Sequence, residues 1–183
     1  AAINGGFFKT RTKQAVAMGF IKTGGYRPAQ IGAETGVAVA VDTAGVLRLI
    51  DWSLAMEQAD APHRDRYPDV MVTGPMLLRG GRSLIPWDST APRHPRSCVG
   101  TKADGTVLLM VVDGRQSRAG GMALCELASA ARLMGAADAI NLDGGGSSTL
   151  WTKGQGIVNA PSDRMLFFRS ERPVCNAIVV KRK

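Results

Sequence analysis

The residues whose types and spacing best suit chemistry lie between Asn141 and Thr149, where the chain reads Asn-Leu-Asp-Gly-Gly-Gly-Ser-Ser-Thr. The Asp143 carboxylate comes just before three consecutive glycines, and three hydroxyl side chains follow them. Glycine adopts positive φ and lets a ligand approach the backbone closely, and successive free N–H groups in such a turn form an anion site. The stretch is typical of a site for an anionic, hydroxyl-rich ligand. A tight turn capped by an aspartate is the alternative.

This glycine run differs from the common glycine-rich motifs of nucleotide-binding proteins and hydrolases. A Walker loop requires Gly-Lys-Ser/Thr, and the run contains no lysine. The Rossmann fingerprint spaces its glycines differently. The nucleophile elbow needs a glycine two residues after its serine, and Ser147 is followed at that step by Thr149.

Five other short segments place polar residues beside glycine, proline or aromatic residues. One begins at Asn4 and continues through two glycines to Phe7 and Phe8. Another ends a buried apolar run with a carboxylate, a glycine and a guanidinium. The five segments are Asn4 to Phe8, Thr73 to Pro75, His94 to Gly100, Val112 to Arg115 and Glu171 to Ala177.

Taken in order with the glycine run, these segments resemble the phosphodiester glycosidase family, over nearly the whole chain from Asn4 to Val180. The resemblance implies a hydrolase that cleaves a glycosyl phosphodiester and releases a sugar from a phosphate-linked acceptor. Its partner is then a glycan or sugar-phosphate substrate. Two alternatives stay open: a non-catalytic glycan or cell-envelope binding module on the same fold, and a phosphodiesterase that cleaves the P–O bond.

The chemistry of the glycosyl phosphodiester bond indicates which catalytic residues to expect. Because phosphate leaves as a stable anion, the site needs cations and N–H donors more than a strong general acid. The anomeric carbon passes through an oxocarbenium-like state, so a carboxylate should lie nearby. Asp143 and Asp113, each at a strand end before glycine, are the candidates, either to activate water or to attack directly. Glu126 is either an ordinary acid at a helix N-terminus or, by the resemblance, a residue that supports or shares the acid–base chemistry.

Arginine binds phosphate through its planar fork, so Arg96 and Arg115 are the first phosphate-binding candidates. Each could instead form a structural ion pair with Asp113 or Asp143. Arg172 either pairs with Glu171 or reaches the site, and Asp163 is expected to cap a turn. His94 is either a proton donor or a loop residue. Further candidates for contacts with the sugar or phosphate are Asn4, Gly144, Gly145, Gly146, Ser147, Ser148 and Asn159.

No metal is assigned from the sequence, and no cofactor is expected to be required. Aspartate and hydroxyl oxygens suit Ca²⁺ or Mg²⁺, so a divalent cation is an open option, but no regular ligand spacing is present. The histidines His63 and His94 and the three cysteines do not have the spacing of a zinc site.

The cysteines allow a prediction of the cellular compartment in which the protein lies. Cys98 and Cys175 both fall in expected strands, at places where the family pattern more often has a small residue, and we predict that they lie on neighbouring strands and can form a disulfide. That bridge would place the protein in a periplasm or outside the cell. Reduced, buried side chains in a cytosolic protein are the alternative. Cys125, on the expected helix, is read as a small buried hydrophobe.

Composition indicates one domain over residues 1–183. The chain is 45% hydrophobic, which is enough to bury a core. Its net charge of +8 favours anionic partners, but aromatic residues make up only 5% and no recognised motif appears, so nucleic acid is not expected. No apolar run approaches the ~20 residues of a membrane span, so stable membrane insertion is not expected either.

Because the chain does not begin with Met, we expect a processed chain or a fragment that lacks upstream residues. The oligomeric state stays open.

The expected fold class is α+β, with a mixed, largely antiparallel sheet and one main helix. Apolar spacing predicts the helix from Met122 to Met134, with Gly135 as its C-cap. The segment from Thr106 to Leu142 is read as a strand–helix–strand crossover, right-handed if it follows the usual rule. Residues 52–68 are expected to be loop and short helix. Strands are expected at residues 14–23, 36–41, 46–50, 69–73, 76–78, 83–85, 98–102, 106–112, 139–142 and 174–180.

Overall fold

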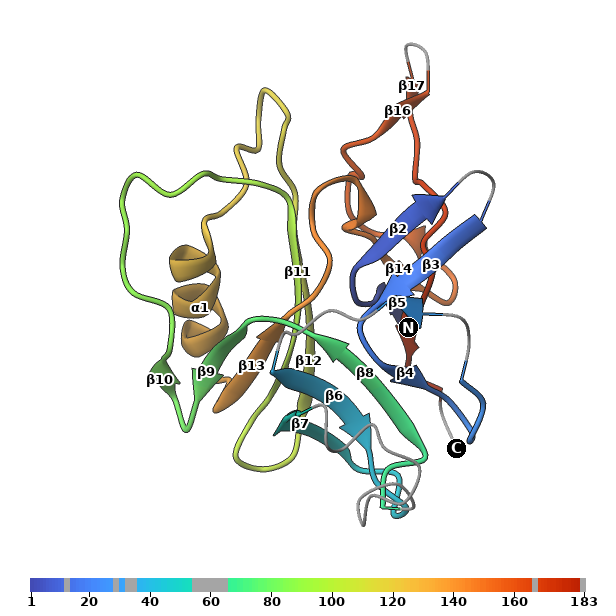
Figure 1. The fold of residues 1–183 in the computed structure, drawn as a ribbon. Coiled ribbons are helices and arrows are strands. Elements are labelled where there is room, and N and C mark those ends of the chain that lie inside the picture. The colour runs from blue at the N-terminus through green and yellow to red at the C-terminus, as the bar shows by residue number, and fades with distance from the viewer. Residues whose placement is uncertain (12–13, 28–29, 32–35, 54–65, 166–167, 182–183) are drawn as a thin grey trace.

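Strands make up most of the regular structure in the computed structural model, which describes residues 1–11, 14–27, 30–31, 36–53, 66–165 and 168–181 (Figure 1). Among the described strands, one pairing is parallel, between β3 (Gln14–Met18) and β5 (Gln30–Ile31). The others are antiparallel. The described chain is therefore largely β-structure with one short α-helix.

A five-stranded sheet carries most of the residues that matter for function. Its order is β10-β9-β13-β11-β12. Both β12 and β13 pair antiparallel with β11, so they run in the same direction with β11 between them. The expected strand–helix–strand connection is confirmed, since the helix joins these two strands. The bounds are β9 (Met76–Arg79), β10 (Arg82–Ser83), β11 (Arg96–Thr101), β12 (Val107–Val112) and β13 (Asp138–Asn141).

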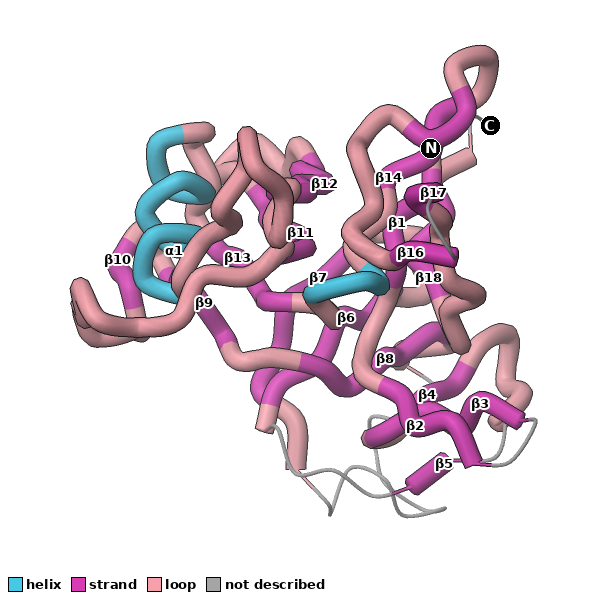
Figure 2. Tube along the Cα trace, turned by 90° about the horizontal axis from the view of Figure 1, so that it is seen from above, coloured by secondary structure: helices cyan, strands magenta, loops and turns pink. Residues whose placement is uncertain are grey.

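The helix α1 (Leu124–Leu133) buries one face against this sheet. Leu127, Ala128 and Ala131 pack with Leu77 and Leu78 of β9 in one hydrophobic cluster. In Figures 1 and 2 the helix lies beside β9, β10 and β13.

The helix ends at Leu133 with Met134 as its C-cap, one residue before the C-cap Gly135 that the sequence predicts. Gly135 adopts φ +89°, donates its N–H to Arg132 O, and the next N–H, of Ala136, reaches Ala131 O. These two bonds and the left-handed glycine form a Schellman motif, which satisfies the last carbonyls of a helix.

Two four-stranded sheets complete the main core. One has the order β4-β8-β6-β7 and the other β15-β14-β1-β18. Ile3 of β1 packs with Met71 of β8 and Ile140 of β13 in a single cluster, so the three sheets share one core. The bounds are β1 (Ala2–Asn4), β4 (Ile21–Lys22), β6 (Val37–Val41), β7 (Leu47–Asp51), β8 (Asp69–Thr73), β14 (Leu150–Thr152), β15 (Gly156–Ile157) and β18 (Ala177–Val179).

Two small sheets contribute no described residue to this shared cluster. β2 (Phe8–Arg11) pairs with β3, and β16 (Arg164–Met165) pairs with β17 (Phe168–Arg169). Figure 1 shows the β16–β17 hairpin projecting from the molecule.

The described residues thus confirm the largely antiparallel pairing and the one main helix, but they form several sheets and not the one mixed sheet of the expected α+β domain. The described strands are two to six residues long and divide among five sheets. The expected segment 14–23 breaks at Gly19 (φ +94°) into β3 and β4. The loop and short helix expected over residues 52–68 lie mostly outside the described residues. Within the part of the chain that the structure describes, no helix is long and apolar enough to cross a membrane.

The predicted disulfide is wrong. Cys98 lies on β11, whose neighbours are β12 and β13, whereas Cys175 lies in a bend before β18, which pairs with β1. Both thiols are free, and burial raises the pKa of Cys98 to about 12, so that thiol is an inert core group. The prediction failed because an apolar run containing cysteine does not specify its sheet. The only residue-level argument for an oxidising compartment fails with it, and the periplasmic or extracellular location stays a prediction.

Candidate functional site

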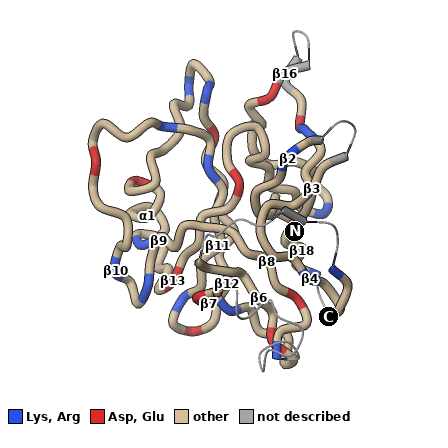
Figure 3. The backbone as a smooth tube through the Cα atoms, in the orientation of Figure 1, with Lys and Arg blue, Asp and Glu red and all other residues tan. Residues whose placement is uncertain are grey.

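A cavity of about 340 Å³ brings together residues from five of the six segments that the sequence singles out. We call it the arginine cavity, after the three guanidinium groups that line it. Figure 3 shows how the acidic and basic residues are distributed along the backbone. Its lining residues are Phe7, Phe8, His94, Arg96, Arg115, Asp143, Gly144, Gly145 and Arg172.

Asp143 is the one carboxylate among these lining residues, and it follows β13 directly. Its N–H donates to Gly5 O at 2.9 Å, and its carbonyl accepts from the Asn4 side-chain amide at 2.7 Å. The Asn4 amide oxygen in turn accepts from Ser97 Oγ at 2.7 Å and from the Thr149 N–H at 3.1 Å. Asn4 is 3% exposed and is not among the lining residues, so it fixes the Asp143 backbone from beneath.

The sixth segment, Thr73 to Pro75, supports the same strand end. Asn141 donates its side-chain amide to Gly74 O at 2.9 Å and its N–H to Pro75 O at 3.0 Å. Thr73 Oγ1 donates to Asn141 O at 3.2 Å. All three contacts hold the chain two residues before Asp143.

Burial raises the pKa of Asp143 above the ordinary aspartate value. The nearby Ser147 hydroxyl, the Gly144 N–H and the charge of Arg172 oppose this rise without cancelling it. A carboxyl group with a raised pKa in a cavity is a common property of catalytic acids and bases.

This shift predicts a pH-dependent cost to stability. The folded protein holds the Asp143 proton more tightly than the unfolded chain, so stability falls as pH rises from the unfolded value of about 3.9 to the raised native pKa. Asp143→Asn removes that cost. We expect the variant to gain stability relative to the wild type as pH rises from 3 to 7 in urea unfolding. A variant that instead loses relative stability over this range would show that the carboxylate stabilises the fold.

The backbone N–H groups of the glycine run are largely occupied, contrary to the anion site expected there. Gly144 donates to Asp143 Oδ1 at 2.9 Å and Gly145 to Pro95 O at 2.9 Å. Ser147 and Ser148 donate at 3.2 Å to carbonyls within the run, which folds as a short 3₁₀ turn (Gly145–Ser147). Attraction for an anion therefore comes from the arginines.

Each glycine of the run is required for its own steric reason. A Cβ at Gly144 would lie 2.8 Å from Pro95 O. Gly145 has φ +62°, and a Cβ there would lie 3.1 Å from Arg115 Nη1. A Cβ at Gly146 would lie 1.8 Å from Asp163 Oδ1. The run thus lets three separate segments close around Asp143.

Arg96 and Arg115 provide positive charge that no carboxylate neutralises among the described residues. The Arg96 Nε donates to Met122 O at 3.0 Å, and burial and the charge of Arg115 both lower the pKa of Arg96. The Arg115 guanidinium makes no hydrogen bond or ion pair within the described chain, and its φ of +54° is the only positive value there outside glycine. Strained backbone of this kind concentrates at functional sites. The alternative of ion pairs with Asp113 or Asp143 is not observed.

Two further glycines let the segments that carry Arg96 and Arg115 pack closely against each other. A Cβ at Gly121 would lie 2.4 Å from the carbonyl atoms of His94, and one at Gly114 would lie 2.7 Å from Pro95 N. His94 and Met122 also exchange backbone hydrogen bonds at 3.2 and 2.9 Å. This packing fixes the half-buried His94 at the cavity, beside the two arginines.

Arg172 reaches the cavity and is paired, but with Asp163 rather than Glu171. Its Nε lies 2.8 Å from Asp163 Oδ2, and both side chains are more than one third exposed. Asp163 therefore acts as the partner of Arg172 and not simply as a turn cap. The pair lies against Gly146, whose missing side chain leaves it room.

Four other candidates from the sequence lie outside the cavity lining. Asp113 accepts the Ala160 N–H at 3.0 Å and the Asn159 amide at 3.1 Å, so it anchors the loop after β15. Asn159 also accepts the Leu150 N–H at 2.8 Å. Ser147 and Ser148 are each 1% exposed and face the interior. These residues support the site and do not line it.

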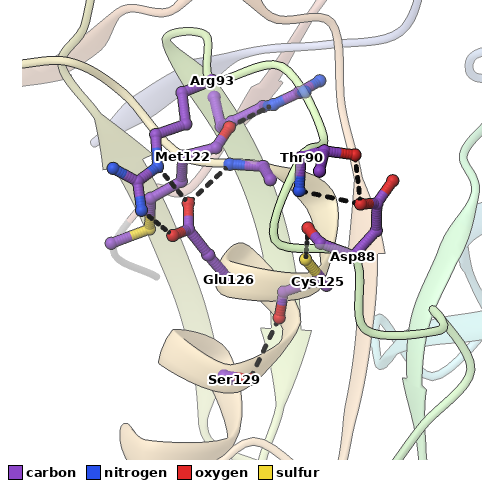
Figure 4. Close-up of polar contacts among 9 residues, drawn as sticks. Asp88, Thr90, Arg93, Met122, Cys125, Glu126 and Ser129 are labelled. Atoms are coloured by element: carbon purple, nitrogen blue, oxygen red, sulfur yellow. Dashed lines mark hydrogen bonds and ion pairs between the residues drawn. The ribbon is translucent and has the colours of Figure 1, made fainter.

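Glu126 also lies outside the cavity. Its Oε2 accepts the Ala123 N–H at 2.9 Å, which caps the start of α1, and the Nε of Arg93 at 2.9 Å (Figure 4). Arg93 and Glu126 form an ion pair, and the hydrogen bond from Arg93, followed by the capping bond from Ala123, lowers the pKa of Glu126. The residue therefore ties the helix to the segment that leads into His94.

Sequence reasoning missed one residue of this framework. Asn176 accepts the Gly6 N–H on its side-chain oxygen at 2.7 Å and the Gly5 N–H on its carbonyl at 2.9 Å. It belongs to a segment that the sequence singles out, but a polar residue before a strand gives no signal of a partner 170 positions away. No cluster of three histidine, cysteine or acidic side chains suited to a metal occurs among the described residues.

The model of the phosphodiester glycosidase family matches residues 1–181. This chain belongs to the phosphodiester glycosidase family. All six segments that carry the resemblance lie within the matched region, and so do all the residues that line the arginine cavity.

Solved structures of similar fold include one of an enzyme. The catalytic domain of zebrafish N-acetylglucosamine-1-phosphodiester alpha-N-acetylglucosaminidase, auto-inhibited by its pro-peptide, superposes with a TM-score of 0.80 at 25% identity. The match covers all of this chain and 63% of the zebrafish chain. A putative exported protein from Burkholderia pseudomallei has a TM-score of 0.68 at 18% identity, covering 96% of this chain and 64% of that one.

A curated relative is also similar in sequence. The SPbeta prophage-derived uncharacterized protein YomE of Bacillus subtilis is 37% identical over 76 residues. The aligned part is 42% of this chain and 12% of that protein. The chain therefore spans only part of each of these relatives.

Proposed function

We propose that this chain hydrolyses a glycosyl phosphodiester and releases a sugar from a phosphate-linked acceptor. The observation that carries the proposal is the arginine cavity itself, where one half-buried carboxylate lies with two guanidinium groups that no acidic side chain neutralises among the described residues. Family membership and the name of the zebrafish enzyme support the same reaction class.

The residues that line the arginine cavity suit the hydrolysis of a glycosyl phosphodiester bond. Arg96 and Arg115 hold the phosphate and stabilise it as it leaves, so no strong acid is needed. Asp143 faces the anomeric carbon, where it stabilises the positive charge and either attacks or activates water. The cavity lining offers one carboxylate rather than the pair that alkyl glycosides require, which favours substrates with an activated leaving group. The proposed reaction requires no cofactor.

The geometry of the guanidinium groups predicts the effect of a conservative change. Arg115→Lys keeps the charge but loses the planar fork that binds two phosphate oxygens. We expect kcat/KM to fall at least about tenfold, equivalent to roughly 1.4 kcal/mol, in an assay with a sugar 1-phosphodiester. Arg132→Lys, on the exposed last turn of α1, is the matched control and should behave as wild type. Equal rates for both variants would remove Arg115 from phosphate binding.

A substrate panel tests the proposal as a whole. Purified protein is incubated with sugar 1-phosphodiesters, the matching alkyl glycosides and simple phosphodiesters without a sugar. We expect sugar release from the first group alone, with inorganic phosphate as a competitor. Cleavage of sugar-free diesters would indicate a phosphodiesterase, and binding without turnover throughout would indicate a non-catalytic binding module.

A further inference from the structure

Two aromatic residues line the arginine cavity without an assigned role. Phe7 and Phe8 are half-buried and belong to none of the hydrophobic clusters formed by the described residues. Core packing therefore does not explain why two phenyl rings lie beside four charged groups.

The backbone that carries these rings is fixed relative to Asp143. Gly5 O accepts the Asp143 N–H at 2.9 Å, and Phe7 O accepts the Met18 N–H at 2.8 Å. The Gly6 N–H donates to Asn176 Oδ1 at 2.7 Å. These bonds hold the backbone of both phenylalanines next to Asp143, and both residues line the cavity.

The rings are also not covered by the cavity arginines. Among the described residues, the guanidinium–aromatic contacts involve Phe20 and Tyr67, which lie elsewhere. Apolar surface in an otherwise charged cavity suits a ligand with one apolar face and one anionic group. A pyranose ring presents such a face through its C–H groups, and aromatic side chains bind faces of this kind.

We infer that Phe7 and Phe8 form the sugar-binding surface of the arginine cavity, and that the sugar ring lies on them while its phosphate is held by the arginines. This inference rests on the proposed function, since it names where each half of that substrate lies. It makes the two phenylalanines determinants of sugar affinity and leaves phosphate affinity to Arg96 and Arg115.

The test separates the two halves of the ligand. Phe7→Leu and Phe8→Leu keep an apolar side chain but remove the flat ring, and Tyr26→Leu, at a 69% exposed aromatic outside the cavity lining, is the matched control. Binding of a panel of hexose 1-phosphates and of inorganic phosphate is measured by calorimetry, after thermal unfolding confirms that each variant folds.

We expect at least one phenylalanine variant to weaken the tightest hexose 1-phosphate by roughly fivefold, while inorganic phosphate binds within about twofold of wild type and the control changes neither affinity. Equal weakening of both ligands, or a wild type that binds no hexose 1-phosphate more tightly than phosphate, overturns the inference. If the expected binding pattern appears but no phosphodiester is hydrolysed, the sugar surface stands and the proposed hydrolysis fails. If a phosphodiester is hydrolysed but neither variant alters the affinity for hexose 1-phosphate, the proposed hydrolysis stands and the sugar surface fails.

Discussion

Asp143→Asn is expected to lower kcat at least about a thousandfold on a sugar 1-phosphodiester while KM changes little. The amide still accepts the Gly144 N–H through its oxygen, so the local backbone is preserved. It carries no charge, however, and cannot stabilise the oxocarbenium-like state or act as a nucleophile or base. Steady-state kinetics on the folded variant give both constants.

A surface carboxylate provides the control. Asp51→Asn changes an 86% exposed side chain that pairs with Arg79 far from the cavity lining, and it should retain wild-type kcat. A folded Asp143→Asn variant with near-normal kcat would show that the chemistry at this site does not depend on the carboxylate.

The second large effect concerns stability. Gly121→Ala places a Cβ where it would lie 2.4 Å from the carbonyl of His94, at a residue with φ +91°. Backbone strain and overpacking together should reduce the free energy of unfolding by about 3 kcal/mol or more. Urea unfolding of the purified variant measures this loss.

The neighbouring Gly120 is a matched control within the same loop. A Cβ there meets no atom within 4 Å, and its φ is not in the left-handed region. Gly120→Ala should therefore unfold within about 0.5 kcal/mol of wild type. Equal stability of the two variants would show that the loop can move away from His94, and that the cavity is not held by this contact.

Local patterns were sufficient to predict much of the fold. The strand from Asp69 to Thr73 is observed with the expected bounds, because the turn that follows it limits where the strand can end. The end of the helix was also predicted to within one residue, since Met134 is the C-cap and Gly135 follows it. Each depends on residues within a few positions of one another, where propensity and turn chemistry decide the structure.

Long-range contacts set the limit of prediction from sequence. The segments that converge on the cavity were identified, yet the sequence did not indicate that Asn4 is buried beneath Asp143 or that Asp113 anchors Asn159. Whether a polar side chain faces the ligand or the interior depends on bonds that span more than 40 residues. The failed pairing of Cys98 with Cys175 has the same origin, since the sheet that each segment joins is not encoded locally.

The most direct test of the proposed function is hydrolysis of a sugar 1-phosphodiester in ¹⁸O-labelled water. Attack at the anomeric carbon, close to Asp143, places the label in the released sugar and leaves the phosphate unlabelled. Mass spectrometry of both products distinguishes the two bonds. We predict label in the sugar alone. Label in the phosphate would show that the P–O bond is cleaved, and would contradict the assignment of this chain as a glycosidase.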